Sequence, residues 1–119
     1  MRNMSFSMTT EAVRRREKTV TRRLGWWNLK PGTILQAVEK AQGLKKGEHV
    51  KPICLIRVVS VTALSLDSIL DRPDRVEECR REGFPELSPI GFVEMFQAAN
   101  ARNCPYFDTI VNRIEFEYL

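Results

Sequence analysis

The densest run of chemically useful side chains in the sequence is KTVTRR, residues 18–23, which holds one amine, two hydroxyls and two guanidiniums. A three-arginine run, residues 14–16, comes shortly before it, and two tryptophans follow at residues 26–27. A guanidinium can contact two phosphate oxygens at once, and an indole offers a base a surface on which to stack. We therefore interpret this segment as the wall of a cleft that handles a nucleotide or RNA. The candidate phosphate and base contacts are Arg16, Arg22, Arg23 and Trp26. If the segment is a regular strand, alternation places Arg22 and Arg23 on opposite sides, so we expect one of them to face the cleft and the other to form a surface ion pair.

The distribution of charge supports this interpretation. Residues 1–23 carry seven Lys/Arg and two Glu, so 7 − 2 = +5, whereas the rest carries 12 basic and 13 acidic residues, so 12 − 13 = −1. The whole basic excess thus surrounds the KTVTRR segment, where it would attract phosphates. The alternative for the charge is a solvated helix face that only aids solubility. The alternative for the tryptophans is that one packs in the core and the other covers an end of the barrel.

Length and composition narrow the class of protein. A chain of 119 residues predicts one domain, spanning residues 1–119. No apolar run approaches the roughly 18 residues of a membrane span, and the N-terminus lacks the apolar stretch of a signal peptide, so we expect a cytoplasmic protein without a membrane partner. Three cysteines without a Cys-x-x-Cys pair and one histidine, His49, predict no metal site and no histidine-pair ribonuclease. Without a phosphate-cradling glycine loop, no cofactor is expected.

The hydrophobic patterns predict an α+β fold. Alternating or β-branched stretches indicate strands at residues 4–8, 18–23, 33–38, 53–62 and 110–119, with the fourth in the centre of the sheet. Short helices are expected at residues 10–17 and 74–81 and after Ser88, which can cap the N-terminus of the last of them. A small barrel or a curled sheet of about five strands, with short flanking helices, fits this pattern best.

A strand, a short helix, Lys-Thr-x-Thr-x-Arg and then Lys-x-Gly (residues 30–32) before the next strand resembles the opening of an ASCH domain. The resemblance extends through the central strand, through Glu82-Gly83-Phe84 ahead of a helix, and to the last strand with Ile114-Glu115-Phe116. The KTxTRR form is similar to short ASCH proteins of phages and prophages. This family belongs to the PUA-like β-barrel superfamily, so the resemblance implies a barrel whose cleft takes RNA or a modified nucleoside.

Some bacterial members that resemble this chain are amidohydrolases acting on N4-acetylcytidine, without a metal, and another branch is ribonucleolytic. The resemblance implies Lys18, Thr21 and Glu82 as the catalytic residues: a threonine nucleophile, a lysine that activates it and a glutamate that moves the proton. Many members have glycine where this chain has Arg16, so the turn before Lys18 is expected to differ. The alternative function is a non-catalytic module that binds RNA or a protein.

Overall fold

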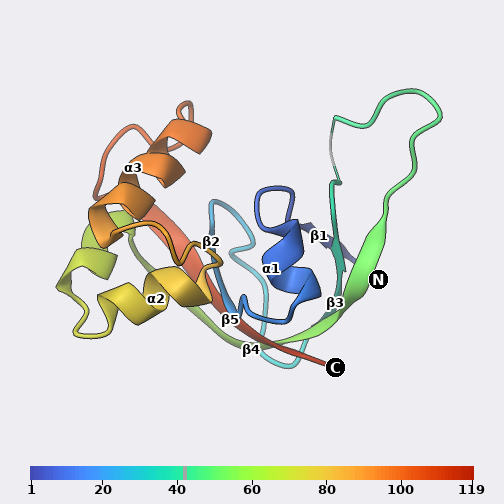
Figure 1. The fold of residues 1–119 in the computed structure, drawn as a ribbon, viewed down its shortest axis with the longest axis horizontal. Coiled ribbons are helices and arrows are strands. Elements are labelled where there is room, and N and C mark those ends of the chain that lie inside the picture. The colour runs from blue at the N-terminus through green and yellow to red at the C-terminus, as the bar shows by residue number, and fades with distance from the viewer. Residues whose placement is uncertain (42) are drawn as a thin grey trace.

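The computed structural model describes residues 1–41 and 43–119, and its elements lie close to the expected segments (Figure 1). In chain order they are β1 (Asn3–Ser5), α1 (Thr10–Arg14), β2 (Val20–Arg23), β3 (Ile34–Val38), β4 (Pro52–Ser65), the 3-10 helix η1 (Leu66–Asp71), α2 (Arg75–Arg81), α3 (Pro89–Ala99) and β5 (Ile110–Tyr118). Helix α1 is shorter than predicted. It ends at Arg14, and Arg16 then adopts a left-handed backbone with φ of 60°, at the position where many ASCH domains have glycine.

The described strands form one mixed sheet in the order β1-β3-β4-β5-β2. Strand β4 is central, as predicted, and pairs antiparallel with β3 on one side and β5 on the other. At the edges, β1 runs parallel to β3, and β2 runs antiparallel to β5. The long β4–β5 ribbon curves beneath the rest of the molecule (Figure 1), so the two edge strands are brought to the same side of the sheet.

The prediction of about five strands with short helices is confirmed, but closure into a barrel is not seen. Among the described residues the strand pairing stops at β1 and β2, which leaves the sheet curled. A side chain bridges these two edges: Arg23 Nη2 on β2 donates a 2.5 Å hydrogen bond to the Ser5 carbonyl oxygen on β1. The space between the edges is thus lined by side chains, which is where a cavity can form.

Two apolar clusters hold the fold together. The first fills the inside of the curl and consists of Met4, Phe6, Val13, Leu29, Leu35, Ala37, Ile56, Val58, Ile114 and Phe116. The second joins the helices to the sheet and consists of Leu66, Ile69, Cys79, Phe92, Val93, Phe96, Cys104 and Val111. Strand β5 contributes to both clusters, so its two faces are buried by different layers. No helix in the described part of the chain is long and apolar enough to cross a membrane.

The turn after α2 fixes the position of Glu82. Gly83 has φ of +93°, as the predicted glycine at a helix C-terminus requires, and its amide bonds to the Arg80 carbonyl oxygen. A Cβ built on Gly83 would lie 3.0 Å from Thr9 Cγ2, a tight contact with the chain that leads into α1. The turn is therefore constrained both by its backbone and by its packing.

We expect Gly83→Ala to lower the free energy of unfolding by about 2 kcal/mol, because a left-handed alanine is strained and its methyl group meets Thr9. Gly32→Ala is the matched control: φ is +89° there, but no atom lies within 4 Å of the added Cβ. Urea denaturation of both variants would separate the steric term from the backbone term. Equal losses in the two variants would show that the contact with Thr9 contributes nothing.

Candidate functional site

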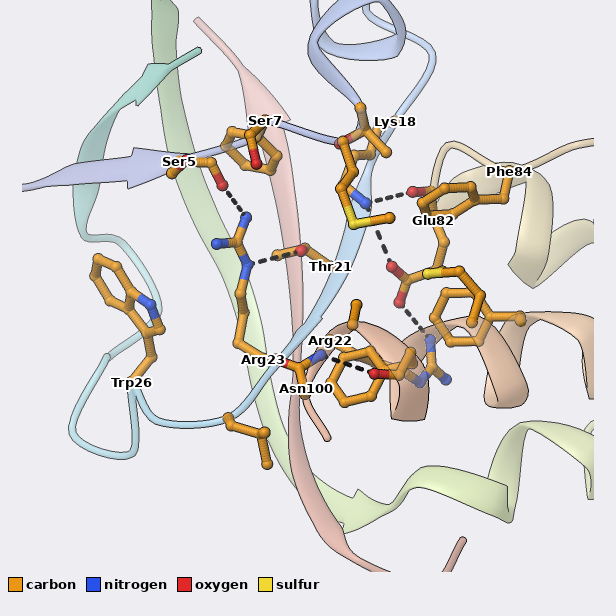
Figure 2. A pocket seen from close by; sticks show the side chains of 18 of the residues that line it. Ser5, Ser7, Lys18, Thr21, Arg22, Arg23, Trp26, Glu82, Phe84 and Asn100 are labelled. Carbon is orange, nitrogen blue, oxygen red and sulfur yellow. Dashed lines mark hydrogen bonds and ion pairs between the residues drawn. The ribbon is translucent and has the colours of Figure 1, made fainter. Parts of the chain in front are cut away.

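A cavity of about 590 Å³ opens between the edge strands β1 and β2 and helix α3. Its polar and charged lining includes Ser5, Lys18, Thr21, Arg22, Arg23 and Glu82, and its apolar lining includes Phe6, Trp26, Phe84, Phe92 and Met95. Figure 2 shows Thr21 and Arg23 on one side of β2, and Lys18, Arg22 and Glu82 on the other. The three residues expected to be catalytic thus line one cavity, although Lys18 and Glu82 are separated by 64 positions.

Lys18 is buried against the start of the turn that follows α2. Its Nζ donates a hydrogen bond to the Glu82 carbonyl oxygen and lies 3.3 Å from Glu82 Oε1. Its own carbonyl oxygen accepts a 2.6 Å hydrogen bond from the Tyr118 hydroxyl at the end of β5. The position of Lys18 is therefore fixed both at its backbone carbonyl group and at its side-chain amine.

Burial sets the protonation of this amine. Desolvation lowers the pKa of Lys18 to about 8, with further lowering by the charges of Arg23 and Arg22, while Glu82 opposes the change. A lysine with such a pKa is partly neutral near physiological pH. It can therefore accept a proton, which an ordinary surface lysine cannot do.

Arg22 lies at the centre of a buried ionic cluster. Its Nη1 donates a 2.8 Å hydrogen bond to Glu82 Oε2, and its Nη2 forms an ion pair of 2.8 Å with Glu78 Oε2. That second pair lacks hydrogen-bond geometry, and Arg22 Nε has no hydrogen-bond partner in the described part of the chain. The expectation that one of Arg22 and Arg23 forms a surface ion pair is wrong, because Arg22 is 3% exposed and both side chains line the cavity.

The sequence did not indicate Glu78 and Arg113 as part of this cluster. Glu78 on α2 is fully buried and accepts hydrogen bonds of 2.6 and 3.1 Å from Arg113 Nε and Nη2. Burial alone would raise the pKa of Glu78, but the Arg113 hydrogen bond and the charge of Arg22 leave it below its ordinary value. Glu78 is thus a carboxylate that neutralises part of the arginine charge behind the cavity.

Arg23 and Thr21 form the other side of the site. Arg23 Nε donates a 3.0 Å hydrogen bond to Thr21 Oγ1, so the hydroxyl keeps its own proton available for donation. No carboxylate lies within ion-pair distance of Arg23 in the described residues, and desolvation lowers the pKa of this guanidinium to about 10. The site therefore contains a guanidinium that feels the charge of Glu82 but is not in contact with a carboxylate in the described part of the chain.

The remaining candidates are placed differently. Trp26 is half-buried on the cavity wall, with the Arg2 guanidinium 4.2 Å from its ring centroid, whereas Trp27 is largely exposed. Arg16 is not among the cavity-lining residues; its guanidinium lies 5.6 Å from the centroid of the Tyr118 ring. In the part of the chain that the structure describes, no group of three His, Cys, Asp or Glu side chains is arranged to hold a metal ion.

Comparisons with known proteins identify the fold. No protein-family model matches the chain, and no curated protein matches its sequence. The ASCH domain from Lactobacillus crispatus JV V101 superimposes with a TM-score of 0.64 at 16% identity, over 98% of this chain and 79% of that one. The hypothetical protein PH0355 superimposes with a TM-score of 0.62 at 18% identity, over 98% and 97%. Protein EF3133 from Enterococcus faecalis V583, described by the family model DUF984, gives 0.59 at 16%, over 95% and 68%. The chain has the fold of an ASCH domain along almost its whole length.

Proposed function

We propose that the cavity binds a nucleoside-sized ligand and that the protein is a metal-independent amidohydrolase acting on an acylated cytidine of the N4-acetylcytidine type. The observation that carries the proposal is the convergence of Lys18, Thr21 and Glu82 on one cavity. A volume of about 590 Å³ is in the range of small-ligand sites. Apolar rings and a few polar groups line it together, as recognition of a base requires.

The arrangement supports nucleophilic catalysis by Thr21. Neutral Lys18, which lines the same cavity as Thr21, accepts the hydroxyl proton through an intervening water molecule while Thr21 Oγ1 attacks the acyl carbonyl carbon, and a tetrahedral oxyanion forms. The carbon–nitrogen bond then breaks, and the proton passes from the Lys18 ammonium, directly or through Glu82 Oε1, to the departing cytidine amine. Lys18 then takes a proton from water, and the hydroxide attacks the threonine ester. The ester carbon–oxygen bond breaks, acetic acid leaves, and the Lys18 ammonium returns its proton to Thr21 Oγ1. The sum of the steps is amide plus water giving cytidine plus acetic acid.

Two arginines support these steps without exchanging protons. Arg22 binds Glu82 Oε2 and leaves Oε1 toward Lys18, so it fixes the orientation of the carboxylate. Arg23 donates to Thr21 Oγ1, where negative charge develops as the hydroxyl loses its proton. In this assignment Arg22 is a positioning residue, and Arg23 stabilises charge at the nucleophile.

The surface charges favour a small ligand over a long RNA. Arg14 in the basic run preceding the motif is paired with Glu11 and Glu39, at 2.6 and 2.5 Å. Arg22 is buried between two carboxylates. The basic excess of the sequence is thus partly neutralised in the fold, which lowers the positive charge available to a long phosphate backbone.

The test is turnover of N4-acetylcytidine by the purified protein, followed by chromatography. We expect Thr21→Val to abolish hydrolysis, because valine has nearly the same shape and no nucleophile, while the thermal unfolding curve stays close to that of the wild type. Thr33→Val is the matched control, since the Thr33 hydroxyl donates to the Lys30 carbonyl oxygen in a turn that does not line the cavity. Turnover retained in Thr21→Val would remove Thr21 from the mechanism. No turnover by the wild type at high protein concentration would favour the non-catalytic binding module.

A further inference from the structure

The charge of the cavity wall does not match a neutral nucleoside. Four cationic side chains line the cavity, Lys18, Arg22, Arg23 and Lys40, against the single carboxylate of Glu82 among the lining residues the structure describes, so 4 − 1 = +3. Glu78 and Arg113 behind the wall cancel each other. Even with Lys18 neutral, the wall keeps an excess of two positive charges. Such an excess in a confined space favours an anionic ligand.

Arg23 is the cation best placed to contact that anion. Two of its nitrogens are used, Nε by Thr21 Oγ1 and Nη2 by the Ser5 carbonyl oxygen. Its Nη1 has no hydrogen-bond partner in residues 1–41 and 43–119. In Figure 2 this third nitrogen points away from Thr21, toward the side of the cavity where Trp26 lies. The guanidinium can therefore face the nucleophile with one edge and a second ligand group with another.

Other residues that line the cavity also suit a phosphate. Lys40 lines the same cavity and is exposed, so its amine can reach a ligand from the rim. Asn3 and Ser7 add an amide and a hydroxyl from the β1 side, and Trp26 adds an aromatic surface. Charge-assisted hydrogen bonds from a guanidinium and an ammonium are the usual means of holding phosphate oxygens.

We infer that the substrate is a nucleoside monophosphate, with its base near Lys18 and Glu82 and its phosphate against Arg23 and Lys40. This inference rests on the proposed function for the identity of the base. The cavity volume accommodates a single nucleotide, and outside the cavity Arg14 of the basic run is already paired with Glu11 and Glu39. The cavity is therefore assigned a phosphate subsite separate from its reacting end.

The decisive experiment compares the binding of cytidine and cytidine 5′-monophosphate by isothermal titration calorimetry at one low salt concentration. We expect the monophosphate to bind the wild type about tenfold or more tightly, and inorganic phosphate to compete with it. Arg23→Gln should bring the two affinities to within about threefold, and Arg23→Lys should keep part of the preference because it keeps the charge. Arg57→Gln, which removes an equal charge from the exposed pair with Glu117, should leave the preference intact.

The outcomes separate this inference from the proposed function. Equal affinities of the wild type for cytidine and its monophosphate would overturn the phosphate subsite, even if N4-acetylcytidine is hydrolysed. A preserved phosphate preference without any hydrolysis would leave the subsite standing and remove the enzymatic proposal. A single-stranded RNA that binds far more tightly than the monophosphate, with a steep dependence on salt, would overturn the assignment of a free nucleotide.

Discussion

Replacing Arg22 with methionine is expected to lower the free energy of unfolding by about 3–5 kcal/mol, the cost of breaking a buried ion pair from one side. Arg22 is 3% exposed and lies within 2.8 Å of carboxylate oxygens of both Glu78 and Glu82. Methionine fills much of the same volume, so the loss comes mainly from leaving two carboxylates in an apolar setting with one fewer cation. Guanidinium chloride denaturation at pH 7 measures it.

Two further variants distinguish this buried pair from an ordinary one. Arg57→Met removes the exposed pair with Glu117, of 2.9 Å, and should cost no more than about 1 kcal/mol. Adding Glu82→Gln to Arg22→Met should restore part of the lost stability, because it removes one of the unbalanced charges. A loss in Arg22→Met as small as that in Arg57→Met would mean that water or local rearrangement compensates both carboxylates.

The sequence predicted the sheet better than its closure. Continuous β-branched and apolar residues in 53–62 indicated a central strand, and β4 has that place. Whether the edges of a sheet meet depends on curvature and on edge-strand length, which hydrophobic patterns do not encode. Here β1 has only three residues and is parallel to β3, and Arg23 bonds to Ser5 where strand pairing would otherwise close a barrel.

The directions of the side chains in the KTVTRR segment could be predicted because neighbouring residues of a strand point to opposite sides. Lys18 and Arg22 share Glu82, while Thr21 and Arg23 bond to each other, as the period of two predicts for an extended segment. Both rows reach the cavity because β2 is an edge strand beside it. The alternation was correct, but the inference that one arginine would therefore face solvent was not.

The buried ionic cluster could not be predicted from local patterns. The helix predicted at residues 74–81 is rich in charged side chains, yet Glu78 is fully buried while the apolar Val76 is 73% exposed. Glu78 is buried on this helix because Arg22 on β2 and Arg113 on β5 form ion pairs with it. Predicting this cluster from the sequence would have required information that relates these three positions to one another.

The second large effect concerns the pH dependence of hydrolysis. Because Lys18 acts as the base in its neutral form and its pKa is about 8, we expect kcat/KM to fall about tenfold per pH unit below pH 8 and to level off above it. Lys18→Met should lower kcat about a hundredfold to ten-thousandfold and remove this acidic limb, since no proton acceptor remains at that position.

The same shift predicts an effect on stability with a definite sign. The pKa of Lys18 is lowered on folding from 10.5 to about 8, so the folded state binds fewer protons than the unfolded state between these values, and stability contributed by this group rises with pH across that window. Lys18→Met should abolish that rise in pH-dependent denaturation, whereas Lys30→Met, at an exposed turn, should preserve both the rise and the acidic limb of the rate profile.

A rate profile that keeps its acidic limb in Lys18→Met would assign the proton acceptor to another group. Since one amine would produce both effects, agreement between the midpoint of the kinetic limb and the lower bound of the stability window would connect the buried lysine to the chemical step.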